Sequence, residues 1–208
     1  PYKVVAKYRN NIISPMVYPT VIKSLCQQFN NAYCLIEIND IGGQVSDVLY
    51  TDLEYENVLM CATKGRKGQT VSSGFAGSGM NFGVRTTQVV KKLGCSVLKS
   101  LIEEDKLIIE DLDIVNELTT FVAKKTSFEA DDGHTDDLVM TLVLFAWLTR
   151  QEYFRSLTDM DVRKEIYEEK IEKLEDEMTP YGIFHDDTEE DEFWDGQDRW
   201  GVAHPETP

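Results

Sequence analysis

Seven consecutive residues, Asp131 to Asp137, combine four carboxylates with one histidine and one glycine, and an apolar run follows them directly. Ten of the eleven residues from Leu138 to Leu148 are apolar, which predicts a central helix that is buried on every side. One or two acids at a helix start complement the helix dipole. Four acids this close repel one another unless a cation lies among them, so we favour a metal site.

The start of this helix decides where the last two acids lie. Thr135 is the expected N-cap, which puts Asp136 and Asp137 in the first turn. His134 precedes the cap and is an auxiliary candidate for orienting water or a phosphate, with a solvated loop residue as the alternative. One isolated histidine does not define a zinc site.

A further acid stands out because it interrupts an apolar stretch. Glu37 lies within Tyr33 to Ile38, a short run that we expect to be a buried strand. A carboxylate in such a strand must be paired or bind a metal ion, because burying a lone charge is costly. A structural salt bridge is the alternative to a metal. Asp40, just past the strand end, either joins the site or caps the next helix.

Glu37, Asp136 and Asp137 are therefore the candidate catalytic residues and metal ligands. Their carboxylate oxygens are hard ligands, which suit Mg²⁺ or Mn²⁺ rather than zinc. Two such ions about 3.5–4 Å apart can activate water and stabilise the leaving oxygen when a phosphodiester is cleaved. The acids thus predict a two-metal site for phosphodiester hydrolysis.

Basic residues gather in the middle of the chain. The segment from Lys64 to Arg85 is rich in glycine and has no hydrophobic periodicity, so we expect a long loop that is either functional or merely solvated. Residues 64–106 hold eight Lys and Arg against three acids, a strip that can contact DNA phosphates without reading sequence. A solvated helix face is the alternative for the lysines. The candidate DNA-binding residues are Lys64, Arg66, Lys67, Arg85, Lys91 and Lys92.

The spacing of apolar residues predicts alternating strands and helices. We expect strands over residues 2–9, 33–38, 58–61 and 107–109, and helices over residues 17–30, 43–52, 86–104 and 114–124. The β-α-β-α-β order of residues 2–61 favours an α/β fold with a mixed sheet flanked by helices. Because the first strand has no preceding cap or turn, we expect the opening strands of the sheet to lie upstream.

Negative charge is concentrated toward the C-terminus. Residues 1–151 carry 15 Lys and Arg and 18 Asp and Glu, a net charge of −3, whereas residues 152–208 carry 6 and 19, a net charge of −13. We expect a folded domain over 1–155, a charged helix over 156–178 and a flexible acidic tail over 179–208. The nearly neutral body is compatible with nucleic-acid binding, because the distribution of charge matters more than its sum.

Several classes of protein are not expected. Cys26, Cys34, Cys61 and Cys95 form no C-x-x-C pair and lie among apolar residues, which favours small hydrophobic side chains in a reducing cytoplasm. The sequence has no signal peptide and no membrane-spanning run, so no membrane is expected as a partner. Residues 65–70 look like a fragment of a phosphate-binding loop with the wrong spacing, so ATP binding is not expected within this chain.

Four stretches carry a family resemblance: I-E-I-N-D-I-G around Glu37, L-Y-T-D-L-E-Y-E from Leu49, G-C-S-V-L-K-S-L-I-E-E-D-K-L-I-I from Gly94, and G-H-T-D-D-L-V-M from Gly133. In this order, over about residues 1–155, they resemble the nuclease domain of the large terminase subunit of tailed bacteriophages. The likeness is greatest to the headful-packaging kind with contractile tails.

This resemblance implies an RNase H-like fold and a metal-dependent endonuclease that cuts concatemeric double-stranded DNA at the start and end of packaging. It also implies an N-terminal ATPase domain in the same polypeptide, a portal protein and a small terminase subunit as partners, and the cytoplasm of an infected bacterial host as location. Glu37 matches the family's second acid, and Asp136 with Asp137 match the closing acid pair.

The chain departs from the family pattern at two points. The family's first aspartate lies on the opening strand, which we expect upstream of Pro1, so residues 1–208 alone are expected to be inactive as a nuclease. Many relatives have the histidine directly before the acid pair, whereas Thr135 intervenes here. Two alternatives stay open: a junction resolvase or integrase-like nuclease of the same fold, and a non-catalytic module for DNA translocation or portal docking. Metal-dependent plasmid nicking, and a preference for four-way junctions, would separate them.

Overall fold

The computed structural model describes residues 1–63, 69–72, 79–124, 127–159, 167, 192–194 and 199–201. The chain divides into two compact units, Pro1–Arg163 and Lys164–Pro208. The domain end expected at residue 155 therefore lies inside the first unit. Of the charged helix expected over 156–178, residues 156–159 and Tyr167 are helical, and the rest lie outside the described residues.

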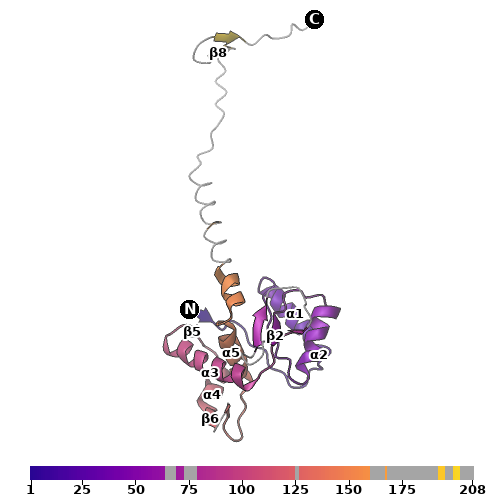
Figure 1. Ribbon diagram of the computed structural model, residues 1–208, viewed down its shortest axis with the longest axis vertical. Helices are drawn as coiled ribbons and strands as arrows, with labels where there is room; N and C mark the ends of the chain where they lie inside the picture. The colour runs from indigo at the N-terminus through magenta and orange to yellow at the C-terminus, as the bar shows by residue number, and fades with distance from the viewer. Residues whose placement is uncertain are drawn as a thin grey trace. The chain divides into compact units, whose positions relative to one another are not determined.

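The first unit contains both helices and strands (Figure 1). The helices are α1 (Tyr18–Gln28), α2 (Gly42–Asp47), the π-helix η1 (Val48–Asp52), α3 (Gln88–Glu103), α4 (Leu112–Thr120) and α5 (Asp137–Leu148). The strands are β1 (Tyr2–Lys3), β2 (Met60–Thr63), β3 (Gln69–Ser72), β4 (Met80–Phe82), β5 (Leu107–Ile108), β6 (Phe121–Lys124) and β7 (Ser127–Ala130). None of the described helices combines the length and the apolar content needed to cross a membrane.

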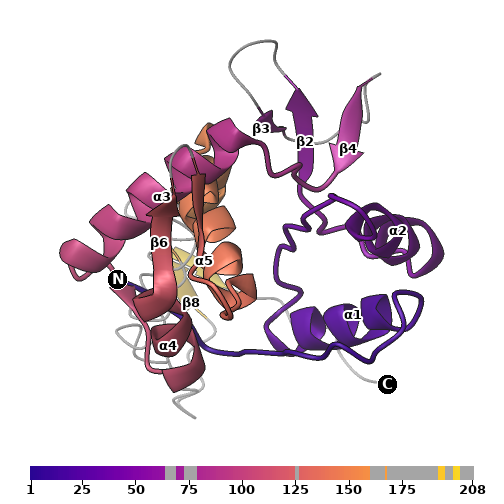
Figure 2. The same ribbon diagram turned by 90° about the horizontal axis from the view of Figure 1, so that it is seen from below.

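The strands pair in both directions, as the predicted mixed sheet requires. Strand β2 lies between β3 and β4 and is antiparallel to both (Figure 2). Strand β1 pairs in parallel with β5, with Tyr2 opposite Leu107. The extended residues 34–37 add parallel bridges from Cys34 to Val58 and from Glu37 to Val84. Strands β6 and β7 form a separate antiparallel hairpin.

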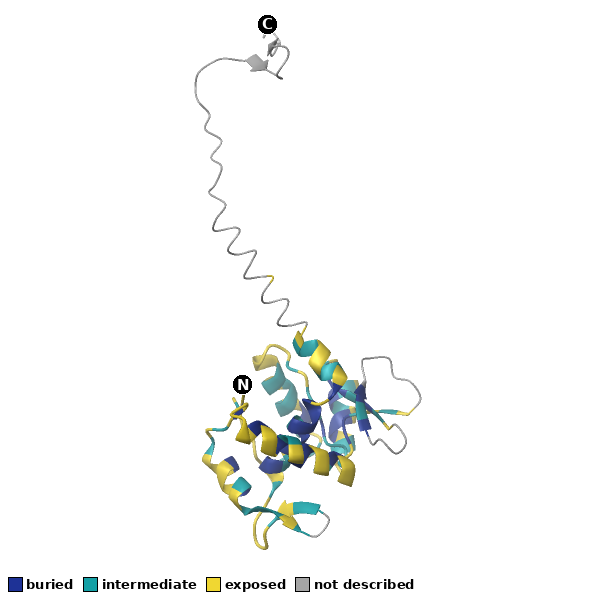
Figure 3. Ribbon diagram, turned by 60° about the vertical axis from the view of Figure 1, so that its left-hand side comes forward, coloured by how far each residue is buried: buried dark blue, intermediate teal, exposed yellow. Residues whose placement is uncertain are grey.

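Helix α5 forms the centre of the core, as its apolar sequence predicts. Eight of its twelve residues are buried, so nearly every side of the helix is covered. Its N-terminal half packs with α3 residues such as Leu98 and Leu101, and its C-terminal half packs with Cys61 and Val71 of the β-sheet. The buried residues gather in the interior, and the outer helix faces are exposed (Figure 3). A further cluster forms around Leu49.

Three expectations about regular structure away from Glu37 and the start of α5 are wrong. The segment expected to be one long loop contains β3 and β4, which pair with β2, while residues 64–68 and 73–78 lie outside the described residues. The helix expected over 114–124 ends at Thr120, and residues 121–124 form β6 instead. Strand β1 ends at Lys3 rather than residue 9. Aromatic and β-branched residues at 121 and 122 suit a hairpin as well as a helix, and pairing with β7 decides.

The four cysteines are free, and two of them behave as small apolar side chains. Burial raises the pKa of the Cys61 thiol to about 12 and that of the Cys95 thiol to about 11. Cys26 differs, because a hydrogen bond with the neighbouring Cys34 side chain lowers the pKa of the Cys26 thiol to about 7. No part of the candidate site described below uses these thiols.

The second unit contains one antiparallel strand pair, β8 (Glu192–Trp194) with β9 (Arg199–Gly201). These six residues fall within the segment expected to be a flexible acidic tail. The other residues of 179–208 lie outside the described residues. Residues 192–194 and 199–201 of this acidic segment are therefore hydrogen-bonded to each other as strands.

Candidate active site

Glu37 lies in an extended segment that is tied to the chain before α3. The Ile38 N–H donates to the Val84 carbonyl over 2.9 Å, and the Val84 N–H donates to the Ile36 carbonyl over 2.7 Å. Instead of the continuous strand expected over 33–38, this segment makes isolated bridges. Helix α2 begins against it, because a Cβ on Gly42 would overlap the Glu37 main-chain oxygen. Glu37 is thereby fixed between α2 and the start of α3.

The three predicted acids line one cavity of about 430 Å³. Three elements meet there: the extended segment with Glu37, the start of α3 and the start of α5. The lining residues are Glu37, Asn39, Thr86, Thr87, Gln88, Lys91, Asp136, Asp137 and Met140. Residues separated by about a hundred positions in the sequence therefore line one cavity.

Helix α5 begins one residue later than expected. Asp136, and not Thr135, is the N-cap, and its carbonyl accepts from the Met140 N–H over 2.8 Å. The Thr135 hydroxyl does not cap the helix because it donates to Glu117 Oε1 over 3.1 Å. Asp137 is therefore the single acid within the first turn, and its side chain is 75% exposed, against 27% for Asp136.

Each acid of the pair faces a cation. Lys91 Nζ lies 3.9 Å from Asp136 Oδ2, and Arg9 Nη2 lies 3.7 Å from Asp137 Oδ2. Lys91 also lies 6.0 Å above the Phe121 ring, within range of a cation–π contact. The sequence predicts DNA contacts for Lys91 and Lys92, with a solvated helix face as the alternative. Lys91 is half-buried and lines the cavity, whereas Lys92 is exposed.

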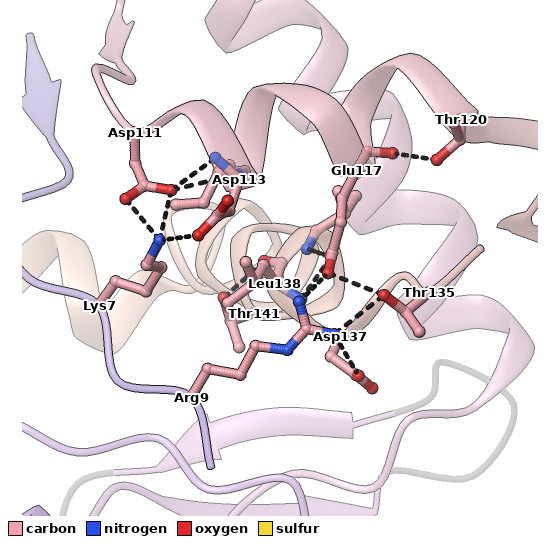
Figure 4. Close-up of polar contacts among 12 residues, drawn as sticks. Lys7, Arg9, Asp111, Asp113, Glu117, Thr120, Thr135, Asp137, Leu138 and Thr141 are labelled. Carbon is pink, nitrogen blue, oxygen red and sulfur yellow. Dashed lines mark hydrogen bonds and ion pairs between the residues drawn. The ribbon is translucent and has the colours of Figure 1, made fainter. Parts of the chain in front are cut away.

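Glu117 of α4 is a buried acid that the sequence interpretation did not select. Figure 4 shows its carboxylate directed at the start of α5, with the Arg9 guanidinium beside it. Arg9 Nη1 lies 3.1 Å from Glu117 Oε1. The signal was present, because Glu117 lies between Ile114 and Leu118 on the inner face of α4, where an acid breaks the apolar stripe.

The donor types fit a hard divalent cation, since the cavity offers carboxylates and the Asn39 amide. The carboxylates are farther apart than the ligands of one ion. Within the described part of the chain, no three His, Cys, Asp or Glu side chains lie closely enough together to hold a metal. Thr86 also lines the cavity, and its hydroxyl is the one buried side-chain polar atom without a partner among the described residues.

The remaining site candidates that the structure describes do not line the cavity. His134 is exposed, and its main-chain N–H donates to the Asp131 carbonyl over 3.0 Å within a turn. Asp40 is exposed in a left-handed turn, and Asn39 contributes to the cavity in its place. Arg85 is exposed near the start of α3. Lys64, Arg66 and Lys67 lie outside the described residues.

Asn39 joins the two walls of the cavity. Its side-chain oxygen accepts from the Thr86 N–H over 3.2 Å, and its amide donates to the Thr86 carbonyl over 3.3 Å. This two-bond link holds the chain just after Glu37 against the chain just before α3. Sequence reasoning selected Asp40 for charge and overlooked Asn39, whose role depends on a partner far along the chain.

One comparison with known proteins bears on this site. The family model of the terminase RNaseH-like domain matches residues 1–148, well over half of the chain. The match spans Glu37, Lys91 and the acid pair and ends with the last residue of α5. It agrees with the mixed α/β architecture and supports a nuclease-type function within a terminase. The chain therefore belongs to the family of terminase RNaseH-like domains.

Proposed function

We propose that this domain is a divalent-metal-dependent endonuclease that cuts double-stranded DNA during viral genome packaging. The observation that carries the proposal is the cavity where Glu37 meets Asp136 and Asp137. Carboxylates from separate elements facing one cavity are the ligand set that hard-cation phosphodiester chemistry uses. Membership of the terminase family supports the same function.

The three acids are the groups that would hold Mg²⁺ or Mn²⁺. Bound ions would supply a Lewis acid and lower the pKa of a water molecule that attacks phosphorus. The protein's own contribution is to place the carboxylates on rigid elements: Glu37 beside α2 and Asp136 at the N-cap of α5. Asp137 follows it in the first turn of α5, and its side chain is 75% exposed.

The opposite wall of the cavity suits a phosphate. Thr87 is the N-cap of α3, and the first N–H groups of a helix have no partner within it and attract anions. Lys91 adds a positive charge one turn further on, and Thr86 lines the same cavity. We infer that a DNA phosphate lies along this wall, opposite the acids.

Neighbouring phosphates would meet exposed cations. Arg85 and Lys92 lie at the start of α3 and on its solvent-exposed side. Contacts of this type hold the DNA backbone and carry no base information. They are consistent with cutting that does not depend on sequence, as headful packaging requires.

The finer parts of the proposal rest on the family resemblance. We infer that the substrate is concatemeric DNA, cut at the start and end of packaging. We also infer three partners: an ATPase domain in the same polypeptide, a portal protein and a small terminase subunit.

Nicking of supercoiled plasmid by the full-length protein tests the proposal, in Mg²⁺, in Mn²⁺ and with a chelator. We expect nicking only with a divalent ion. Glu37→Gln should lower the rate by about 100-fold or more, since changes even to groups that merely support a ligand cost about 10- to 100-fold. The matched control is Glu103→Gln, an exposed acid paired with Lys99 over 3.6 Å. Metal-independent nicking, or full activity of a folded Glu37→Gln protein, would contradict the proposal.

A further inference from the structure

One buried carboxylate contacts the chain on both sides of the acid pair. Glu117 Oε2 accepts from the Leu138 N–H over 2.8 Å and from the Val139 N–H over 3.3 Å. Glu117 Oε1 accepts from the Thr135 hydroxyl over 3.1 Å. Asp136 and Asp137 are the two residues that lie between these contacts in the sequence. Figure 4 shows Asp137 near Thr135 and Leu138.

The contacts replace a cap that α5 lacks. The N-cap Asp136 makes no side-chain hydrogen bond to the helix, and the first N–H groups of a helix have no partner inside it. Leu138 and Val139 are buried, so their N–H groups cannot turn to water instead. Glu117 supplies the acceptor from another helix, α4.

Arg9 makes this burial of a negative charge tolerable. Glu117 is 7% exposed, and an unpaired carboxylate at that depth would be strongly disfavoured. Arg9 Nη1 lies 3.1 Å from Glu117 Oε1, and Arg9 Nη2 donates to the Thr135 hydroxyl over 3.0 Å. The same guanidinium reaches Asp137 Oδ2 at 3.7 Å. Arg9 thus contacts Glu117, Thr135 and Asp137 with one guanidinium group.

We propose that Glu117 is a positioning residue of the nuclease site, which fixes the main chain on both sides of Asp136 and Asp137 and so sets where their carboxylates lie. This inference rests on the proposed nuclease function. The main chain of residues 136 and 137 cannot shift without breaking the contact at Thr135 or those at Leu138 and Val139. Glu117 does not itself line the cavity, so it acts through the acid pair.

The hydrogen bonds from the Leu138 and Val139 amides to Glu117 can be tested by hydrogen exchange without metal or DNA. In Glu117→Ala, the Leu138 and Val139 amides lose their acceptor, and we expect their hydrogen exchange to quicken by at least about tenfold. Glu117→Gln keeps one carbonyl oxygen that can accept from both amides, so it should keep most of the protection. Asp113→Asn is the matched control, because Asp113 lies on the same helix and pairs with Lys7 over 2.5 Å, away from α5. It should leave both amides unchanged.

The effect on the site is measured by Mn²⁺ binding and plasmid nicking with the full-length protein. We expect Glu117→Ala to weaken Mn²⁺ binding or lower kcat by about 10- to 100-fold, the usual cost of losing a group that orients ligands. A simple loss of folded protein would lower the rate without changing the Mn²⁺ concentration that half-saturates it. Glu117→Gln should restore most of the activity, and Asp113→Asn should retain all of it.

Thr135→Val provides a second test if Glu117→Ala fails to fold. It removes the hydroxyl that donates to Glu117 and leaves the buried carboxylate in place. We therefore expect the amide protection, the Mn²⁺ binding and the nicking rate to change in the same direction as in Glu117→Ala, but by less. The inference is overturned if folded Glu117→Ala keeps wild-type protection at Leu138 and Val139. It is also overturned if Mn²⁺ binding and nicking stay within about twofold of wild type. An inactive wild-type protein would overturn the proposed function instead, and the exchange and Mn²⁺-binding results would then decide on Glu117 alone.

Discussion

Asp136 and Asp137 are adjacent in the chain, yet their carboxylates are paired with cations from different elements. Lys91 comes from α3, and Arg9 comes from the segment that follows β1. These two cations offset part of the repulsion between neighbouring acids, which otherwise would require a bound metal. A divalent ion entering the cavity must therefore compete with two positive charges that the protein already supplies.

Replacing Lys91 by glutamine should strengthen metal binding and weaken DNA binding. Removing about 1 kcal/mol of charge repulsion in a water-exposed site corresponds to roughly fivefold tighter Mn²⁺ binding without DNA. Calorimetric titration measures the first effect, and fluorescence anisotropy with labelled duplex measures the second. Lys92→Gln is the matched control, since Lys92 is exposed beside it. Lys92→Gln should weaken DNA binding alone, and unchanged Mn²⁺ affinity in Lys91→Gln would show that Lys91 does not act on the acids.

Single residues were predictable where they broke a local pattern. Glu37 interrupts an apolar run, and Asp136 with Asp137 precede an apolar helix, and all three line one cavity. Glu117 breaks the apolar stripe of α4 in the same way, but its partners Arg9 and Leu138 lie far from it in the sequence. No local spacing could identify them, because the contacts exist only after α4 and α5 have packed.

Helices α3 and α5 approach each other more closely than most side chains allow. A Cβ on Gly94 would overlap the Val143 main-chain oxygen and its side chain. Helix α3 carries Lys91 and helix α5 carries the acid pair, so this contact sets the distance between the two walls of the cavity. The helix pair lies side by side along the core (Figures 1 and 2).

Gly94→Ala tests that contact. Helix propensity favours alanine by about 1 kcal/mol, whereas overpacking a rigid core costs about 1–3 kcal/mol. The obstructing atom is main-chain oxygen, which cannot rotate away, so we expect a net loss of about 1–2 kcal/mol in the free energy of unfolding. Urea unfolding measures it. Ser96→Ala on the exposed side of α3 is the control and should be neutral or slightly stabilising. A Gly94→Ala protein as stable as wild type would mean that the helices separate at little cost.

Elements were predictable in proportion to their length. The apolar spacing over 17–30 and 86–104 persists for several turns, and α1 and α3 lie within those ranges. Strands β3 and β4 have four and three residues, too few for alternation to separate them from a loop. They exist because β2 offers two edges, which is a property of the fold and not of the segment itself.

Charge separates the two units of the whole molecule. Residues 1–163 carry 17 Lys and Arg and 21 Asp and Glu, a net charge of −4, and residues 164–208 carry 4 and 16, a net charge of −12. Every buried apolar cluster found in the described residues lies in the first unit. The described core therefore lies in the first unit, which also holds the proposed DNA-contacting residues, while the sequence of the second unit is strongly acidic.

Ending the protein at Arg163 should therefore leave its stability unchanged and tighten its binding to DNA. The melting temperature should stay within about 2 °C, because no described core residue is removed. The attached acidic segment repels DNA and competes for the same cations, so its removal should raise duplex affinity at low salt by about threefold or more. The gain should shrink as salt rises, since the Debye length falls from about 30 Å at 0.01 M to about 8 Å at 0.15 M.

Fluorescence anisotropy across a salt series measures the DNA affinity, and thermal melting measures the stability. A truncated protein that melts much earlier would show that residues 164–208 complete the fold, and a salt-independent gain would show that they block the DNA surface directly.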